Sequence, residues 1–309
     1  MQEYTISKEE MLKWCSIPKE KLADHPDSKV KFIMRDEKKV VFDLAADMMC
    51  NELIKNNAEG KITKWVLGSG PKAHYPRFIE RVNSERISLK NLWVFQMDEC
   101  LDWQGRPYPL GNHPLSCEGR MRAQFYGKID PELNVPEEQR LFPKLEDLDL
   151  LDRKCDELGG IDTVWAGVGY KGLVANNETP IDPYQRVSLE EYANSKTRVV
   201  YVTPDNIIQY SERDFGGCYD LCNPMMLTIG MKTMLSAKRA VYIITTGAWK
   251  QTALRVAMFS EPTLEYPVTL FPKYVKDITL LCDSFTADHP YSHDSFYNFQ
   301  NLKGKDYED

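Results

Sequence analysis

The sequence lacks any apolar run long enough to cross a bilayer, and it has no excess of basic residues. A membrane-spanning helix needs about 20 consecutive apolar residues, so we expect no membrane association. Residues 1–5 show no basic segment followed by an apolar one, so we expect no signal peptide. The net charge of −7, from 39 basic and 46 acidic residues, argues against nucleic acid as a partner.

Paired C-x-x-C motifs are also absent, although the chain contains 8 cysteines. Scattered cysteines of this kind are typical of reduced, structural thiols, so we expect a cytoplasmic protein. His289 and His293 are four residues apart, but Pro290 between them argues against a shared helical face and therefore against a metal site. We expect neither a metal ion nor another cofactor.

The sequence does contain enough apolar material for one large core, since 42% of its 309 residues are hydrophobic. This length and composition predict a single α/β domain with terminal additions. Residues 1–38 are polar and interrupted by Pro18 and Pro26, and we expect an N-terminal extension there. We expect the domain over residues 39–286 and a polar C-terminal tail over residues 287–309.

Short apolar runs alternate with helical stretches along the domain. The apolar runs predict strands over residues 65–67, 92–97, 161–166, 198–203, 225–229, 241–245 and 278–282. Apolar residues at helical spacing and the segments between the strands predict helices over residues 40–56, 73–86, 114–126, 145–158 and 252–259. This alternation favours a parallel or mixed sheet covered on both faces, with ligands at the carboxyl ends of its strands.

The most informative segment is a glycine-rich loop, residues 167–180, which we define as the crest. It follows a predicted strand, and its first six residues match G-x-G-x-x-G, where glycines let a ligand come close to the backbone. A dinucleotide-binding loop must open a helix, whereas Pro180 ends this loop, so NAD binding is disfavoured. A tight turn that binds no ligand is the alternative interpretation.

Polar residues follow two other predicted strands. Residues 68–70 precede Pro71 and a predicted helix, so their N–H groups could hold a phosphate, although an ordinary strand–helix connection explains them equally well. Asp98 and Glu99 end an apolar strand, where neighbouring carboxylates push each other's proton affinities apart, which suits a general base. A solvated strand end is the alternative for this pair.

Two basic residues and one more carboxylate complete the candidate set. Arg198 opens a predicted strand, Lys250 follows another predicted strand and a turn, and Glu178 lies in the crest. An arginine grips phosphate through two N–H groups and a lysine adds a point charge, although each residue alone is most often a surface charge.

In their order and spacing, these segments resemble the glucosamine-6-phosphate deaminases. The motifs that carry the likeness are Met97-Asp98-Glu99, His113-Pro114-Leu115-Ser116, Gly167-Val168-Gly169 through Asn177-Glu178, Ser195-x-Thr197-Arg198 and Gly247-x-x-Lys250. The likeness covers residues 40–282, and the chain is identified as a divergent member of this sugar-phosphate isomerase group. The related 6-phosphogluconolactonases share the glycines of the crest, but Asn177-Glu178 and Ser195-x-Thr197-Arg198 fit the deaminase branch better.

The resemblance implies a Rossmann-like three-layer α/β sandwich with a mostly parallel sheet. It implies that Asp98 is the base that moves a proton between C1 and C2 of an open-chain sugar, and that Glu178 supports ring opening. Family members often form homo-oligomers. The implied substrate is a small-molecule sugar phosphate that contacts Gly68, Ser69, Gly70, Glu99, Gly167, Gly169, Arg198 and Lys250.

Three departures from the family pattern alter this expectation. Lys171 and Leu173 stand where the family has Asp and His, and Gly70 stands where a hydroxyl residue is usual. Losing a positioned acid or base costs about 10²–10⁴ in rate. Our first hypothesis is aldose–ketose isomerisation, with or without ammonia release, in which Lys171 is the acid at oxygen if its amine is buried. The alternatives are a non-catalytic sugar-phosphate binder or regulator, and a substrate without phosphate.

Overall fold

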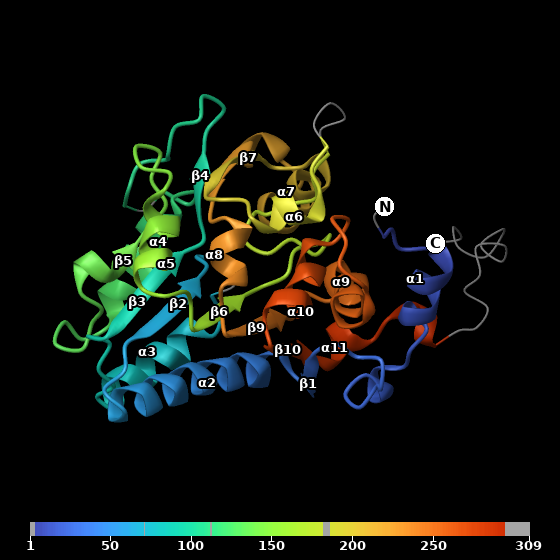
Figure 1. Ribbon diagram of the computed structural model, residues 1–309, viewed down its shortest axis with the longest axis horizontal. Helices are drawn as coiled ribbons and strands as arrows, with labels where there is room; N and C mark the ends of the chain where they lie inside the picture. The colour runs from blue at the N-terminus through green and yellow to red at the C-terminus, as the bar shows by residue number, and fades with distance from the viewer. Residues whose placement is uncertain (1–3, 71, 112, 182–185, 294–309) are drawn as a thin grey trace.

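The computed structural model describes residues 4–70, 72–111, 113–181 and 186–293 (Figure 1). Its main sheet has seven strands, all parallel to their neighbours, which confirms the mostly parallel sheet expected from the sequence. In spatial order the strands are β1 Lys31–Arg35, β10 Asp277–Asp283, β9 Arg239–Ile244, β6 Thr163–Ala166, β2 Thr63–Leu67, β3 Leu92–Gln96 and β5 Arg140–Leu141.

The order of the strands reverses between β2 and β6. Beyond β2 lie β3 and β5, whereas β9, β10 and β1 lie beyond β6 on the other side. Loops that leave two such strands diverge, so a crevice forms between them at the carboxyl edge of the sheet. Residues 68–70 leave β2 and the crest leaves β6, so the topology brings these two segments together.

Helices flank the main sheet or extend from its edges (Figure 1). Their bounds are α1 Lys8–Cys15, α2 Lys38–Ala58, α3 Tyr75–Ser84, α4 Cys117–Gln124, α5 Leu150–Glu157, α6 Leu189–Ala193, α7 Pro204–Phe215, α8 Met231–Leu235, α9 Ala248–Phe259, α10 Phe271–Tyr274 and α11 Ser284–Ala287.

Two apolar clusters fix helices on opposite faces of the sheet. Phe78 of α3 shares one cluster with α2 and with Trp65 of β2. Leu254 of α9 shares the other with α5, α8 and the next residue of β2, Val66. Successive side chains of a strand point to opposite faces, and every residue of β2 is buried, so both faces are covered. The expected three-layer sandwich is therefore confirmed.

A second sheet, antiparallel and three-stranded, extends from the carboxyl edge of the main one (Figure 1). Its strands are β4 Asp98–Leu101, β8 Met225–Thr228 and β7 Arg198–Tyr201, with β8 in the middle. Sequence patterns predicted β7 and β8 but not β4, because adjacent carboxylates indicate the end of a strand. In the structure, the carboxylates of Asp98 and Glu99 lie on opposite faces of β4 and have different surroundings.

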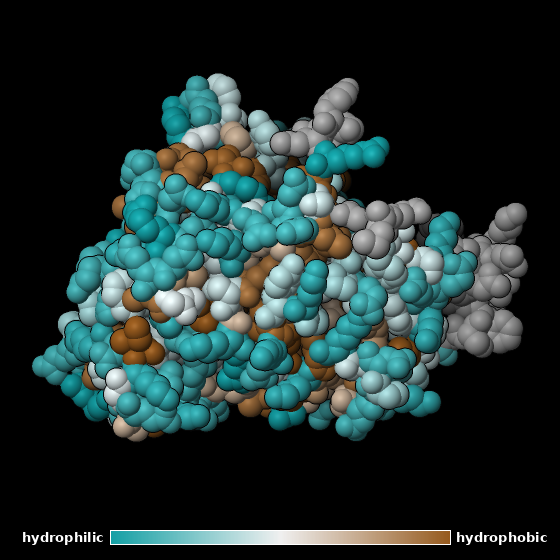
Figure 2. All heavy atoms as spheres, in the orientation of Figure 1, coloured by the Kyte–Doolittle hydropathy of each residue, from teal (hydrophilic) through white to brown (hydrophobic). Residues whose placement is uncertain are grey.

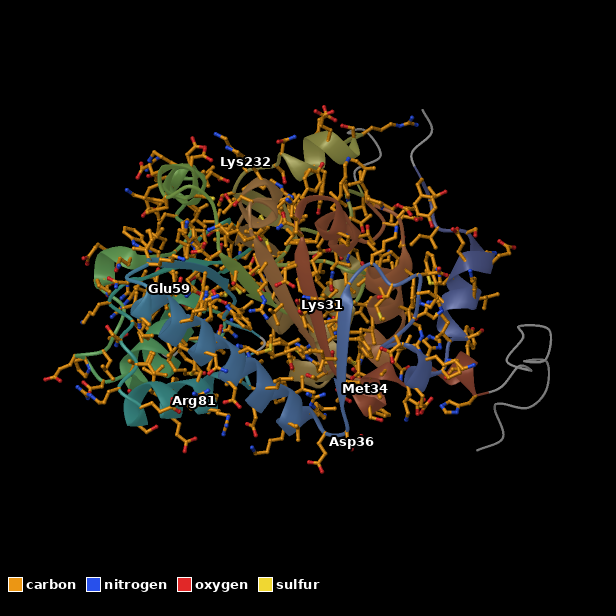
Figure 3. The ribbon with its side chains drawn as sticks, turned by 60° about the horizontal axis from the view of Figure 1, so that its bottom comes forward. Lys31, Met34, Asp36, Glu59, Arg81 and Lys232 are labelled. Atoms are coloured by element: carbon orange, nitrogen blue, oxygen red, sulfur yellow. The ribbon has the colours of Figure 1, made fainter. Side chains whose placement is uncertain are left out.

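The N-terminal residues contribute to the main sheet. Within residues 1–38, β1 pairs with β10 along its whole length, and α1 packs against α9. Figure 3 shows Lys31 and Met34 on this edge strand and Asp36 in the turn that leads into α2. The expected N-terminal extension is therefore corrected for β1, which belongs to the main sheet. Sequence patterns did not predict this strand, because four of its five residues are exposed or half-buried. The remaining domain limits stay predictions, and residues 294–309 of the expected tail lie outside the described residues.

The surface facing the viewer in Figure 2 is largely hydrophilic, with apolar side chains in small groups between polar ones. None of the helices in the described part of the chain combines the length and the apolar character of a membrane span. The formation of a homo-oligomer stays a prediction.

We predict that β1 is part of the folding unit. Phe32 is 6% exposed and belongs to the same apolar cluster as Leu254, so Phe32→Ala leaves a cavity. The free energy of unfolding, measured by urea denaturation, should fall by about 3 kcal/mol. The neighbouring exposed Lys31→Ala is the control and should change it by less than about 0.5 kcal/mol. Equal effects of the two substitutions would show that β1 is dispensable.

Candidate active site

The loop after β2 is fixed by two hydrogen bonds. The carbonyl oxygen of Gly68 accepts from the Tyr75 hydroxyl at 2.7 Å, and the Ser69 hydroxyl accepts from Nη2 of Arg120 at 3.0 Å. A Cβ atom on Gly68 would lie 3.1 Å from the sulfur of Met97, so space is tight there. A Cβ atom on Gly70 would meet nothing within 4 Å, so sterics do not explain the loss of the family's hydroxyl residue.

The helix expected directly after this loop begins later than the sequence indicated. α3 starts at Tyr75 instead of residue 73, and its N-cap is His74. Pro71, which precedes the predicted helix, lies outside the described residues. Because several residues separate residues 68–70 from the helix, any phosphate held by this loop would depend on the Arg120 side chain more than on the N-terminus of α3.

Asp98 lies in a row of three residues that crosses the second sheet. Asp98 of β4 and Arg198 of β7 both stand directly opposite Thr228 of β8. Directly opposite residues share a face, so the Asp98 and Arg198 side chains leave the same face, with their backbones roughly 10 Å apart. The structure thus brings together the expected base and one expected phosphate ligand.

The crest lies over this row. The backbone N–H of Asn176 donates to the Thr228 hydroxyl at 3.0 Å, and Nη1 of Arg198 donates to Oδ1 of Asn177 at 2.9 Å. Arg198 also donates to the Ser195 hydroxyl at 3.2 Å. Its pKa is lowered because it is partly buried. The crest and the second sheet therefore enclose Asp98 from two sides.

The Asp98 carboxyl group is held in an unusual environment. Its Oδ1 atom is inaccessible to solvent and has no hydrogen-bond partner among the described residues. Burial raises the pKa of Asp98 to about 6, although Asn176, Thr228 and the positive charge of Arg120 act in the opposite direction. A carboxylate with a pKa close to neutrality combines a useful ionised fraction with basicity, which suits a general base.

Glu99 faces away from Asp98, because successive residues of a strand point to opposite faces. Its carboxylate accepts hydrogen bonds from the backbone N–H groups of Cys117 at 2.7 Å and Glu118 at 2.8 Å, at the N-terminus of α4. Both oxygens are thereby used to anchor α4, where a negative charge is favourable. Substrate contact by Glu99 stays a prediction, and the geometry makes it a positioning residue for α4.

Arg120 is a site residue that sequence analysis missed. It lies on α4, and its Nη2 atom contacts both Ser69 and the sulfur of Cys117, the latter at 3.3 Å. Its Nε atom is buried and has no hydrogen-bond partner among the described residues. A single arginine in a helix is usually a surface charge, and only the anchoring of α4 by Glu99 brings this one beside the loop after β2.

The glycines of the crest serve close packing. The N–H of Gly169 donates to the carbonyl oxygen of Leu173 at 2.7 Å, and a Cβ atom on Gly169 would lie 2.1 Å from the Leu173 side chain. Gly172 has a φ of +71° and packs against Tyr266, where a Cβ atom would lie at 2.9 Å. Gly167 follows β6 directly, at the reversal of strand order. Ligand contact by Gly167 and Gly169 stays a prediction.

Lys250 is a buried cation in the first turn of α9. Its amine donates to the carbonyl oxygen of Val168, which ties α9 to the crest, and no carboxylate among the described residues pairs with it. Burial, helped by the positive charge of Arg213, lowers the pKa of Lys250 to about 7. A bound anion would restore the charged form, so this amine is suited to hold a phosphate.

Glu178 and Lys171 lie where the crest meets α7. The Glu178 carboxylate accepts from the N–H of Thr203, the N-cap of α7, at 3.2 Å, and burial raises its pKa. Lys171 is 50% exposed, and its amine lies 3.8 Å from Oδ2 of Asp205. The role of Lys171 as the acid at oxygen required a buried amine, and the structure does not show one. Leu173, two residues further on, is buried.

Between the crest and the start of α7 lies a narrow pocket. Its volume open to water is about 10 Å³, enough for roughly one water molecule and too small for a sugar phosphate. A sugar can therefore occupy this position only if α7 and the crest separate. The lining side chains are Lys171, Leu173, Glu178, Thr179, Ile181, Thr203, Asp205 and Asn206.

The fold defines a class: a Rossmann-like α/β sandwich, in which ligands bind where the order of the strands reverses. Mouse (Mus musculus) glucosamine-6-phosphate deaminase 2 is 30% identical over 260 residues, which cover 82% of this chain and 87% of that protein. A glucosamine-6-phosphate deaminase from Phocaeicola vulgatus is 31% identical over 225 residues, which cover 72% and 78%. The chain therefore belongs to the glucosamine-6-phosphate deaminase family, although no family model matches it.

Solved structures agree on the fold. A monomeric glucosamine-6-phosphate deaminase, described as the missing link of the NagB superfamily, superposes with a TM-score of 0.68 at 22% identity, covering 84% of this chain and 99% of that one. A 6-phosphogluconolactonase from Trypanosoma cruzi gives 0.60 at 18% identity, covering 85% and 98%. The described residues hold no group of three or more His, Cys, Asp or Glu side chains arranged for a metal ion.

The environment of Asp98 predicts a pH-dependent effect on stability. The pKa of Asp98 is about 6 in the folded protein and about 3.9 in the unfolded chain. Ionisation of Asp98 therefore lowers the free energy of unfolding as the pH rises above about 3.9, and the full effect is reached above about pH 6. Asp98→Asn should raise the free energy of unfolding by about 3 kcal/mol at pH 7.5 and much less at pH 4.

Urea denaturation at the two pH values tests this prediction. The exposed Asp24 provides the control, because Asp24→Asn removes one carboxylate without relieving burial. The raised pKa of Asp98 would be contradicted if Asp98→Asn stabilised the protein equally at both pH values, or at neither.

Proposed function

We propose that this protein interconverts the aldose and ketose forms of a sugar phosphate or amino-sugar phosphate, with or without release of ammonia. In the proposed reaction Asp98 takes a proton from C2 of the open-chain aldose and returns it to C1. The observation that carries this proposal is the carboxyl group of Asp98, a half-buried residue with one oxygen inaccessible to solvent and unpaired and a pKa of about 6. Membership of the glucosamine-6-phosphate deaminase family supports the choice of substrate class.

A protein that only bound a sugar would gain nothing from this arrangement. Burying a carboxylate oxygen that has no hydrogen-bond partner costs stability, and groups with strongly shifted pKa values cluster at functional sites. The environment of Asp98 therefore favours catalysis over the alternative of a non-catalytic binder. The proposed phosphate ligands are Lys250 and Arg198, with Ser69 and Arg120 on the side of β2.

Leu173 limits the form in which the sugar can react. It stands where the family has a histidine for ring opening, and a leucine side chain cannot transfer a proton at any pH. Lys171 is half-exposed and paired with Asp205, so it does not replace that histidine in this closed arrangement. We therefore propose a substrate that enters in its open-chain or ketose form, or that opens readily in water.

The first activity prediction concerns the base. Asp98→Asn should lower the rate of ammonia release and of aldose–ketose exchange about 10²–10⁴-fold. The rate of the unmodified protein should rise between pH 5 and pH 7, with a midpoint near 6, as Asp98 loses its proton. Both products should be assayed with hexose and hexosamine 6-phosphates. Equal rates for the variant and the unmodified protein would remove Asp98 as the base.

The second activity prediction concerns the phosphate. Hydrogen bonds to charged groups contribute about 1.5–3 kcal/mol, so Lys250→Met or Arg198→Ala should raise KM for a sugar phosphate about 10–100-fold. With the same sugar lacking its phosphate, the variants and the unmodified protein should have similar KM values. Steady-state kinetics with both sugars provides the measurement, and unchanged KM values for the phosphorylated sugar would indicate a substrate without phosphate.

A further inference from the structure

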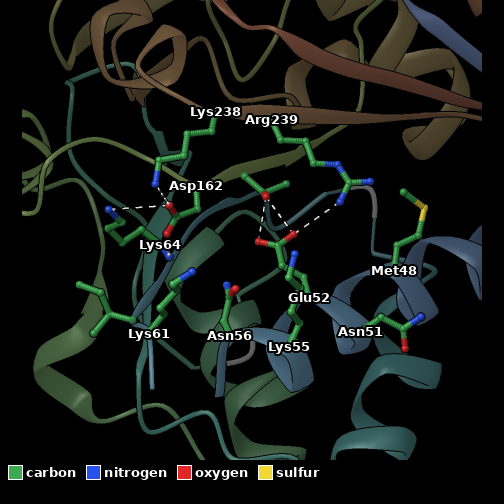
Figure 4. A pocket seen from close by; sticks show the side chains of 12 residues that line it. Met48, Asn51, Glu52, Lys55, Asn56, Lys61, Lys64, Asp162, Lys238 and Arg239 are labelled. Atoms are coloured by element: carbon green, nitrogen blue, oxygen red, sulfur yellow. Dashed lines mark hydrogen bonds and ion pairs between the residues drawn. The ribbon is translucent and has the colours of Figure 1, made fainter. Parts of the chain in front are cut away.

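A hollow of about 700 Å³ lies at the amino edge of the main sheet, opposite the edge that carries Asp98 (Figure 4). Its floor includes Lys64 near the start of β2, Thr163 at the start of β6 and Arg239 at the start of β9. One wall is the C-terminal half of α2. The five residues of β2 separate the two edges by roughly 15 Å, so the hollow is distinct from the candidate active site.

The two carboxylates in the hollow are already engaged. Glu52 accepts from the Thr163 hydroxyl at 2.8 Å and from Nε1 of Trp65 at 2.7 Å. Asp162 accepts from the Lys238 amine at 2.7 Å and from the backbone N–H of Lys64 at 2.9 Å. Figure 4 shows these two groups in the centre of the hollow, each held by its neighbours. They are thus unavailable to a cation or to an amine ligand.

Positive charge remains in excess. Five basic side chains line the hollow, against the carboxylates Glu52 and Asp162: Lys55, Lys61, Lys64, Lys238 and Arg239. Two carboxylates outside the lining also contact them, Glu59 at 2.5 Å from Lys61 and Asp277 at 3.5 Å from Arg239. Figure 4 shows the Lys55 and Lys61 side chains pointing toward the two carboxylates from the end of α2 and the turn that follows. This local excess contrasts with the net charge of −7 for the whole chain and would concentrate small anions there.

Two of these cations are incompletely paired. Lys55 forms no ion pair with a described residue, and it is exposed toward solvent. The Nε atom of Arg239 is buried without a hydrogen bond in the described part of the chain, and its nearest carboxylate contacts are long, 3.5 Å to Asp277 and 3.7 Å to Glu52. A guanidinium in this state can still accept a phosphate or carboxylate as a partner.

We propose that this hollow is a second binding site that takes a small, multiply charged anion, most simply a phosphorylated metabolite. Its volume lies in the range of small-molecule sites, about 300–1,000 Å³. Lys55 and Lys61 provide charge at its rim, Arg239 provides a planar donor at its floor, and the amide of Asn56 lies between them. The site does not depend on the proposed reaction, because no residue of the Asp98 edge contributes to it.

Calorimetric titration of the full chain with inorganic pyrophosphate tests this site. Arg198→Ala with Lys250→Ala weakens the anion site at the other edge, and pyrophosphate should still bind to this double variant. Adding Lys55→Glu and Lys61→Glu should weaken that remaining binding about tenfold or more, because two attractive charges become repulsive. Both lysines are exposed, so the fold should tolerate their substitution.

A matched control separates a built site from general charge effects. Lys13 and Lys128 are exposed lysines outside the hollow, and Lys13→Glu with Lys128→Glu changes the net charge by the same amount. Binding that falls only with the Lys55 and Lys61 substitutions supports the proposal. No detectable binding to the Arg198 and Lys250 double variant, or equal weakening by both pairs of glutamates, overturns it.

Discussion

The arrangement of this protein depends on one constraint: the Asp98 carboxyl group must be partly withdrawn from water at the point where the main sheet reverses its strand order. Asp98 satisfies the constraint because β4 leaves β3 for a second sheet, and because the crest lies over the row formed with Thr228 and Arg198. Burial favours the protonated form of Asp98, so its ionised form at neutral pH lowers the free energy of unfolding. The neighbouring Glu99 is also buried, but its oxygens are matched by the N–H groups of α4.

The crest shows what Leu173 and Lys171 do in place of the His and Asp expected from the resemblance. Leu173 packs on Gly169 and makes the crest a compact apolar turn. Lys171 turns to Asp205 at the start of α7, where Glu178 is also held, so the crest and α7 close on each other. The proposed phosphate ligands Arg198 and Lys250 both bond to the crest, whereas Leu173, which stands in place of the histidine expected from the resemblance, is buried.

Sequence patterns predicted the main sheet well, because strands buried on both faces give continuous apolar runs. The predicted helices likewise correspond to α2, α3, α4, α5 and α9. β1 and α7 were missed, since one is a short edge strand of mixed polarity and the other is rich in polar residues. Arg120, the opposite orientations of Asp98 and Glu99, and the hollow at the amino edge depend on contacts between distant segments, which no local pattern encodes.

The most direct test of this account is a carbon-13 NMR titration of the side-chain carboxyl of Asp98, assigned by comparison with Asp98→Asn. Burial beneath the crest predicts a midpoint near pH 6. A midpoint close to about 3.9, the ordinary value for an aspartate, would mean that the carboxyl group is solvated and would contradict the central claim.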